Sequence, residues 1–182
     1  DNRLTLPMSG TGSAAMEATL ANIVEPGDTV LVCIKGYFGH RLADMAQRYK
    51  AKVETIEKNW GDAFSLNEIE DALQKYQPSV LAIVHAETST GVCQPMQGIG
   101  ELCHQHDCLL LLDTVTSLGA VPLYLDSWKV DLAYSCSQKG LSCPPGLGPF
   151  TMNQRAEKKL NERKEKVPNW YLDVSLLNKY WG

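Results

Sequence analysis

Short apolar runs alternate along this chain with amphipathic stretches, and this alternation restricts the possible folds more than any other feature of the sequence. The apolar runs cover residues 29–34, 80–84, 109–112 and 132–135, and residues 52–56 alternate like a further strand. Helices are expected at residues 14–24, 39–49, 65–73 and 95–106. Because short buried strands separated by helices form sheets covered on both faces, we expect an α/β fold with a mainly parallel central sheet.

Charge and hydropathy exclude several classes of protein. The 182 residues carry a net charge of −4, which argues against a nucleic-acid-binding protein that relies on basic charge. The apolar runs are much shorter than a membrane span, so no membrane partner is expected. Many of the basic residues gather after residue 153, where they alternate with glutamates at helical spacing. This pattern favours a solvated helix face, and an anion-binding surface is the alternative.

The six cysteines form no Cys-x-x-Cys pair. Several lie in apolar runs, as Cys33 does, which predicts buried thiols in a reducing compartment. The segment 103–108 contains two cysteines, two histidines and an aspartate, but its spacing differs from that of structural zinc sites. Cys108 also begins an apolar run, so we expect its side chain in the core and no metal site there.

In an open α/β sheet, ligands bind beyond the carboxyl ends of the strands, so the segments after each strand are where a site is expected. Residues 9–13, Ser-Gly-Thr-Gly-Ser, precede a predicted helix and are typical of a phosphate site, because a helix start offers free N–H groups. An ordinary turn and helix cap is the alternative. Gly10, Gly12 and Ala15 also fit a loose dinucleotide-binding pattern, in which Lys35 would meet a ribose phosphate.

Three further strand ends carry polar residues. The loop 85–91 is rich in hydroxyls, which suits either a ligand or an ordinary Ser/Thr-rich turn. Asp113 ends a buried strand, where a carboxylate is costly unless paired, so it either caps a turn or meets a cationic nitrogen. Lys139 follows the last strand, and it is either a surface lysine or an amine that forms a Schiff base.

These strand ends together supply the groups that pyridoxal phosphate requires. The phosphate needs a helix N-terminus, the ring nitrogen needs a carboxylate such as Asp113, and the aldehyde needs an amine such as Lys139. The combination is much more specific than any one of its parts. The sequence therefore predicts a pyridoxal phosphate site, with Lys139 and Asp113 as its catalytic residues.

Motifs along almost the whole chain resemble those of one family, the fold-type-I, class V aminotransferases of the alanine–glyoxylate and serine–pyruvate branch. Insect 3-hydroxykynurenine transaminases share the pattern. The matching stretches read S-G-T-G-S-A-A-M-E-A, N-I-V-E-P-G-D, H-A-E-T-S-T-G-V-C-Q-P, E-L-C-H-Q-H-D-C-L-L-L-L-D-T-V-T-S-L-G, S-C-S-Q-K-G, P-P-G and a closing Y-L-D…Y-W-G.

The resemblance implies a role for each residue of the site. Lys139 would bind the cofactor aldehyde, Asp113 would pair with the ring nitrogen, and Val115 and Phe38 would pack on its two faces. Thr88 would contact the phenolic oxygen or its surroundings. The residues implied at the phosphate are Thr11, Gly12, Ser13 and Gln138.

Some positions depart from the usual pattern of this family. Phe38 replaces a common tryptophan, Thr88 a common serine, and Ser13 a histidine found in some members. The run Gly140-Leu141-Ser142-Cys143 after the lysine is also unusual. The first three changes retain an aromatic ring, a hydroxyl and a polar side chain. They bear on substrate preference and cofactor affinity more than on the class of reaction.

The resemblance implies a homodimeric enzyme that moves an amino group from alanine or serine to glyoxylate or pyruvate by a ping-pong mechanism. Its partners would be small amino and keto acids, in a peroxisome or mitochondrion. A 3-hydroxykynurenine transaminase and an inactive homologue that acts as a binding protein are the alternatives, and the dinucleotide-dependent dehydrogenase gives Lys139 and Asp113 no role.

Family members have chains roughly twice as long, as two domains require. Residues 1–153 would then form most of the cofactor-binding large domain. Residues 154–182 would form a charged helix and an aromatic segment that lead towards a small domain beyond residue 182. That small domain would carry the arginine that binds the substrate carboxylate, so we expect residues 1–182 alone to be a poor catalyst.

Overall fold

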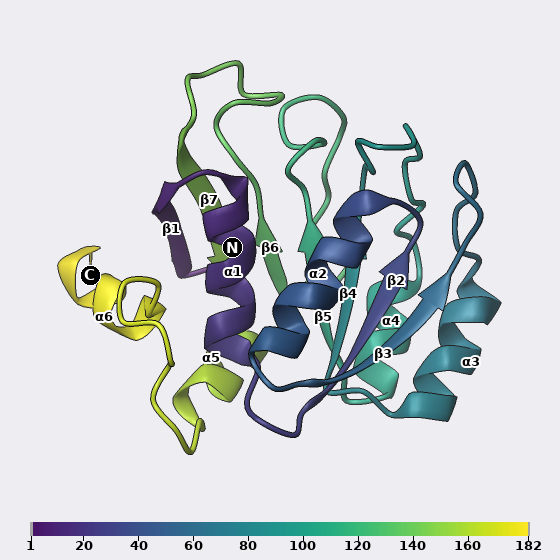
Figure 1. Ribbon diagram of the computed structural model, residues 1–182, viewed down its shortest axis with the longest axis horizontal. Helices are drawn as coiled ribbons and strands as arrows, with labels where there is room; N and C mark the ends of the chain where they lie inside the picture. The colour runs from purple at the N-terminus through teal and green to yellow at the C-terminus, as the bar shows by residue number, and fades with distance from the viewer. Residues whose placement is uncertain (1, 182) are drawn as a thin grey trace.

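The computed structural model describes residues 2–181 and contains one mixed sheet with helices on both faces (Figure 1). Asp1 and Gly182, the last residue of the Y-L-D…Y-W-G motif, lie outside the described residues. The strands are β1 (Leu4–Gly10), β2 (Thr29–Ile34), β3 (Lys52–Glu57), β4 (Val80–Val84), β5 (Leu109–Asp113), β6 (Leu132–Tyr134) and β7 (Gly146–Met152). The helices are α1 (Gly12–Ile23), α2 (Tyr37–Arg48), α3 (Leu66–Tyr76), α4 (Ile99–Gln105), α5 (Gln154–Asn161) and α6 (Val174–Trp181).

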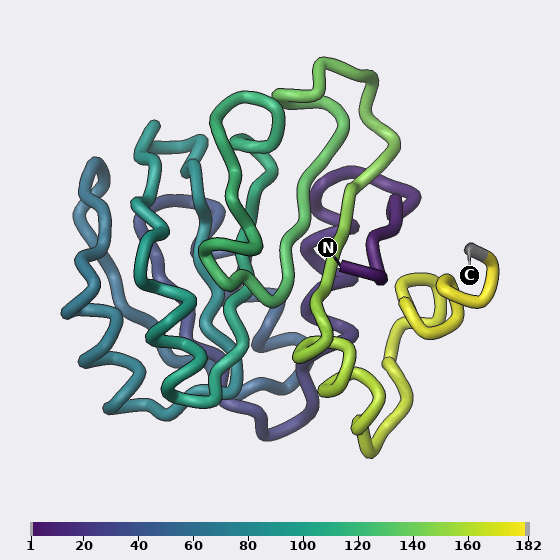
Figure 2. Tube along the Cα trace, turned by 180° about the vertical axis from the view of Figure 1, so that it is seen from behind, coloured from purple at the N-terminus to yellow at the C-terminus, as the bar shows by residue number. Residues whose placement is uncertain are grey.

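The sheet confirms the expected α/β class. Its strand order is β1-β7-β6-β5-β4-β2-β3. Strands β2 to β6 all run in the same direction, and β7 is antiparallel to both of its neighbours, β1 and β6. Figure 2, seen from behind, shows the C-terminal segment beside the β1 edge. Because the parallel strands point the same way, the loops after them gather at one edge of the sheet, at the top of Figure 1.

Two apolar cores lie on opposite faces of the sheet. Successive residues of a strand point to opposite faces, so Val32 and Leu111 join the core under α1 and α2, while Leu31 and Leu110 join the core under α3 and α4. All four side chains are fully buried. This burial on both faces explains why the central strands read as continuous apolar runs rather than as alternating ones.

Local signals in the sequence set several boundaries correctly. A capping box is present at the start of α3, where the Ser65 side chain accepts from the Glu68 amide and the Glu68 carboxylate accepts from the Ser65 amide. The helix expected from residue 95 is partly wrong, because α4 begins only at Ile99. Gly98 has a φ of +86°, a left-handed conformation that a helix interior does not tolerate.

The charged segment after residue 153 is helical only as far as Asn161. Arg163 then donates to the carbonyl oxygens of Asn22 and Val24, at 3.1 and 2.9 Å, and so binds the C-terminal end of α1. The solvated-face interpretation therefore holds for the exposed Lys158 of α5, but not for Arg163 or for Arg155, which donates to the buried Asp131 at 2.9 Å. Within residues 2–181, no helix is long and apolar enough to cross a membrane.

The sequence predicts buried thiols, but two of the six cysteines are exposed. Cys33, Cys103, Cys108 and Cys136 are buried free thiols, whereas Cys93 and Cys143 are exposed. Both exposed thiols lie in loops that follow strands of the sheet, outside the apolar runs on which the expectation was based.

Candidate active site

The site expected from the sequence lies where the turns after β1, β2, β4, β5 and β6 meet at the carboxyl edge of the sheet (Figure 1). The β1–α1 turn is tight, because Gly10 has a φ of +139° and a Cβ there would lie 2.6 Å from Ala14 Cβ. Thr11 is the N-cap of α1, but its side chain makes no capping hydrogen bond, and the first turn contains no acidic residue. The positive end of the helix is therefore available to an anion.

Gly12 brings this helix start against the ends of two other strands. A Cβ at Gly12 would lie 3.0 Å from Val115 Cγ2 and 3.1 Å from Cys136 Cβ. Glycine thus lets the start of α1 pack closely against the ends of β5 and β6. Val115 is half-buried beside it.

Asp113 is held rigidly at the end of β5. It is 3% exposed, and its two carboxylate oxygens accept hydrogen bonds from the Tyr134 hydroxyl at 2.6 Å and the Val115 amide at 2.8 Å. Burial raises the pKa of Asp113 to about 6, although both hydrogen bonds act to lower it. A carboxyl group in this state would be stabilised by a cationic partner, such as a protonated ring nitrogen.

Lys139 and Gln138 follow β6 in a turn closed by a hydrogen bond from the Ser142 amide to the Lys139 carbonyl oxygen, 2.9 Å long. The Lys139 side chain is exposed, and its cation lowers the pKa of Cys136, which burial raises. Lys139 lies three residues after Cys136, against which Gly12 packs. Gln138 Oε1 is buried and has no hydrogen-bond partner within the part of the chain that the structure describes.

Thr88 and Phe38 approach the same edge from β4 and α2. The Thr88 hydroxyl is 2.5 Å from that of Thr116, which links the loop after β4 to the loop after β5. The Arg41 guanidinium lies over the Phe38 ring, 4.7 Å from its centroid, and donates to Ser13 Oγ at 3.0 Å. Arg41 thus connects the ring-stacking candidate with the helix start. Sequence analysis missed it, because nothing in a helix surface pattern distinguishes such an arginine.

The dinucleotide alternative fails at Lys35. Lys35 is buried, and its Nζ points to the carbonyl oxygens of His85 and Val92, both at 3.5 Å, instead of to a ligand edge. It cannot meet a ribose phosphate in that position. The buried Glu87 is a further charged residue of this region, and no pattern in the sequence indicates a role for it.

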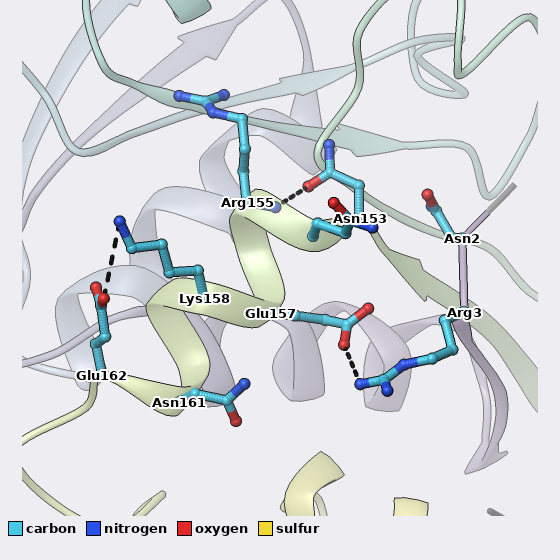
Figure 3. Close-up of a pocket in the computed structure, with 9 residues that line it drawn as sticks. Asn2, Arg3, Asn153, Arg155, Glu157, Lys158, Asn161 and Glu162 are labelled. Carbon is cyan, nitrogen blue, oxygen red and sulfur yellow. Dashed lines mark hydrogen bonds and ion pairs between the residues drawn. The ribbon is translucent and has the colours of Figure 1, made fainter.

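A surface hollow with a volume of about 770 Å³ lies elsewhere, between the start of β1 and α5 at the opposite end of the sheet (Figure 3). Its charged side chains pair with one another, as Arg3 does with Glu157 at 2.8 Å and Lys158 with Glu162 at 3.8 Å. We therefore place the candidate site at the carboxyl edge, where buried and exposed functional groups converge.

Comparisons with known proteins show which family this chain resembles. A family model described as "Aminotransferase class-V" matches residues 1–169. An alanine–glyoxylate aminotransferase of Rattus norvegicus is 46% identical over 181 residues, which are 100% of this chain and 44% of that protein. The crystal structure of an alanine–glyoxylate aminotransferase from Nostoc sp. superposes with a TM-score of 0.99 at 64% identity, covering 100% of this chain and 48% of that one.

A further solved structure has almost the same fold. A ureidoglycine–glyoxylate aminotransferase from Bacillus subtilis has a TM-score of 0.98 and 40% identity, covering 100% of this chain and 47% of its own. The chain thus spans less than half the length of the relatives it matches.

Proposed function

The chain belongs to the class-V aminotransferase family, and on that premise we propose that the whole protein is a pyridoxal-phosphate-dependent aminotransferase. The observation that carries the proposal is the convergence of Asp113, Lys139 and the uncapped start of α1 at one edge of the sheet. These are the carboxylate, the amine and the anion site that the cofactor needs.

The residues of the site fit the cofactor. Its phosphate would lie at the free N–H groups of α1, held by Thr11, Gly12, Ser13 and Gln138. Its ring would lie between Val115 and Phe38, with Thr88 beside its phenolic oxygen. The uncapped start of α1, with no acidic residue in its first turn, is a feature of this chain that a bound phosphate would explain.

The chain's own residues would then divide the chemistry. When bound, pyridoxal phosphate supplies an aldehyde that condenses with amines and a ring that takes up negative charge. Asp113 would hold a proton on the ring nitrogen, because Tyr134 and the Val115 amide keep its carboxylate aligned. Lys139 would bind the cofactor and, once displaced by the amino substrate, would move a proton at its Nζ.

For the substrates, we propose alanine or serine as amino donor and glyoxylate or pyruvate as acceptor, with a place in glyoxylate metabolism. The names of the Rattus norvegicus and Nostoc sp. relatives support the alanine–glyoxylate pair. They support it over a 3-hydroxykynurenine transaminase or an inactive binding protein. The homodimer and the peroxisomal or mitochondrial location rest on the resemblance alone.

A labelling experiment on the full-length protein tests the assignment of the lysine. Borohydride reduction of protein loaded with pyridoxal phosphate should leave a pyridoxyl group on Lys139, located by peptide mass spectrometry, with the half-exposed Lys129 unmodified as an internal control. The Lys139→Ala variant should lose at least ~100-fold in alanine–glyoxylate transamination, since a positioned proton carrier contributes that much. A protein that binds no pyridoxal phosphate, or a variant with the wild-type rate, would contradict the proposal.

A further inference from the structure

Glu87 is a buried carboxylate at the end of β4 for which the site described so far has no use. It is 1% exposed. One oxygen accepts from the Phe38 amide at 3.2 Å, and the other accepts from the Ser89 amide at 3.1 Å and the Ser89 hydroxyl at 2.7 Å. Ser89 Oγ in turn accepts from the Tyr37 amide at 2.9 Å. Through these bonds Glu87 reaches the first two residues of α2.

This arrangement replaces the cap that α2 lacks. The N-cap residue is Gly36, which offers no side-chain acceptor, and a Cβ there would collide with Glu87 Cγ and Ser89 Oγ. The carboxylate thus occupies the space that a cap residue of α2 would need. Anions are stabilised at helix N-termini, so the pairing favours both the helix and the buried charge.

Lys35 contacts the same loop as Glu87. Its Nζ donates to the carbonyl oxygens of His85 and Val92, both at 3.5 Å, and the Val92 carbonyl also accepts from the Glu87 amide at 2.9 Å. Burial lowers the pKa of Lys35, and Glu87 is the first of the anions that oppose this. In an interior with few other charges, the cation offsets part of the cost of burying the carboxylate.

Glu87 therefore connects two groups that the proposed function uses. Phe38, whose amide it binds, would stack on one face of the cofactor ring. Thr88, the next residue in the chain, would lie beside the phenolic oxygen. We propose that Glu87, with Lys35 as its buried counter-charge, is a positioning residue that fixes Phe38 and Thr88 relative to each other in the cofactor site. This inference rests on the proposed function.

The experiment compares wild-type full-length protein with Glu87→Gln, Lys35→Met and Ser89→Ala. The exposed Glu57→Gln substitution on β3 is a matched control for loss of a glutamate charge. Glu87→Gln keeps the size of the side chain but replaces one acceptor oxygen by an NH₂ donor. The glutamine side chain therefore cannot accept from the Phe38 amide and the Ser89 amide at the same time. Ser89→Ala removes the hydroxyl that joins Glu87 to the Tyr37 amide and leaves the bond from the Phe38 amide in place, which keeps the test usable if the other variants fold poorly.

Three measurements separate positioning from stability. The dissociation constant for pyridoxal phosphate should rise at least ~10-fold in Glu87→Gln, as expected for loss of charge-assisted hydrogen bonds, and less in Ser89→Ala. The circular dichroism of the bound cofactor should weaken, because the signal depends on a fixed orientation. Hydrogen exchange at the Phe38 amide should accelerate in the cofactor-free protein, where no activity is involved.

Lys35→Met should shift all three measurements in the same direction. Adding Lys35→Met to Glu87→Gln should change each measurement much less than Lys35→Met does in the wild-type protein, because the carboxylate that pairs with Lys35 is already gone. Glu57→Gln should match wild type. If Glu87→Gln has unchanged affinity and dichroism, even with lower stability, then Glu87 only caps α2 and the inference is wrong. The proposed function would be unaffected by that result. A wild-type protein without affinity for pyridoxal phosphate would overturn both.

Discussion

At the scale of single residues, the strand-end carboxylate has the most measurable physical signature. The pKa of Asp113 is raised by burial from 3.8 to about 6. The folded state therefore binds a proton more tightly than the unfolded state, so this group's contribution favours folding below pH 4 and is lost as the pH rises through 6. The shift corresponds to about 3 kcal/mol in the cofactor-free protein.

We accordingly expect the unfolding free energy of cofactor-free wild type, minus that of Asp113→Asn, to fall by about 2 kcal/mol between pH 4 and pH 7. Subtracting the variant removes the contribution of other titrating groups, such as His85, whose pKa burial lowers. Denaturant titrations at a series of pH values measure the difference. A difference that stays constant, or that rises with pH, would contradict this account of Asp113.

The residues of the site were predictable from the sequence to the extent that they follow strands. Asp113 and Lys139 each follow an apolar run, so their place at one edge was a consequence of parallel topology. Glu87, Lys35 and Arg41 were not predictable. Their importance depends on pairing between residues about 30 to 50 positions apart in the chain, as in the Arg41–Ser13 and Phe38–Glu87 bonds, and a single sequence carries no signal of that pairing.

At the scale of elements, the strands that sequence analysis missed are β1 and β7. These two pair with each other in antiparallel register, with Pro7 opposite Pro149, and β7 also contains two glycines. Proline and glycine weaken the strand pattern, because proline donates no hydrogen bond and glycine has no side chain to pack. The central strands were predictable because their burial on both faces leaves a continuous apolar run.

One buried carboxylate fastens α5 to the sheet. Asp131 is fully buried and accepts from the Leu110 amide at 2.8 Å, from Asn153 Nδ2 at 2.8 Å and from Arg155 Nη1 at 2.9 Å. It thereby joins β5 to the residues at the start of α5. Removing its charge leaves the half-buried arginine and a buried amide without their partner.

We therefore expect Asp131→Asn to lower the free energy of unfolding by about 3 kcal/mol, as for other broken buried pairs. The exposed Asp44→Asn substitution, which breaks only a surface pair with Arg48, should cost less than about 1 kcal/mol. Chemical denaturation of both variants beside wild type measures the two effects. Equal losses in the two variants would show that Asp131 is not an anchor of α5.

At the scale of the whole molecule, the segment after residue 153 exposes large aromatic side chains. Trp170 is 76% exposed and Tyr171 is 57% exposed, on a segment beside the β1 edge. Large exposed aromatics close together are typical of surfaces that another domain or subunit covers. The relatives have chains more than twice as long as this one.

We expect Trp170 to be shielded in the full-length protein. The fluorescence difference between wild type and Trp170→Phe isolates the emission of this residue, and its quenching by acrylamide measures its accessibility. Shielding by a small domain of the same chain should persist on dilution, whereas shielding by a partner copy should be lost as a homodimer dissociates, in parallel with the sedimentation coefficient. A Trp170 signal that is quenched as readily as free tryptophan at all protein concentrations would show that neither covers it, and the segment would then be an open surface of the assembled protein.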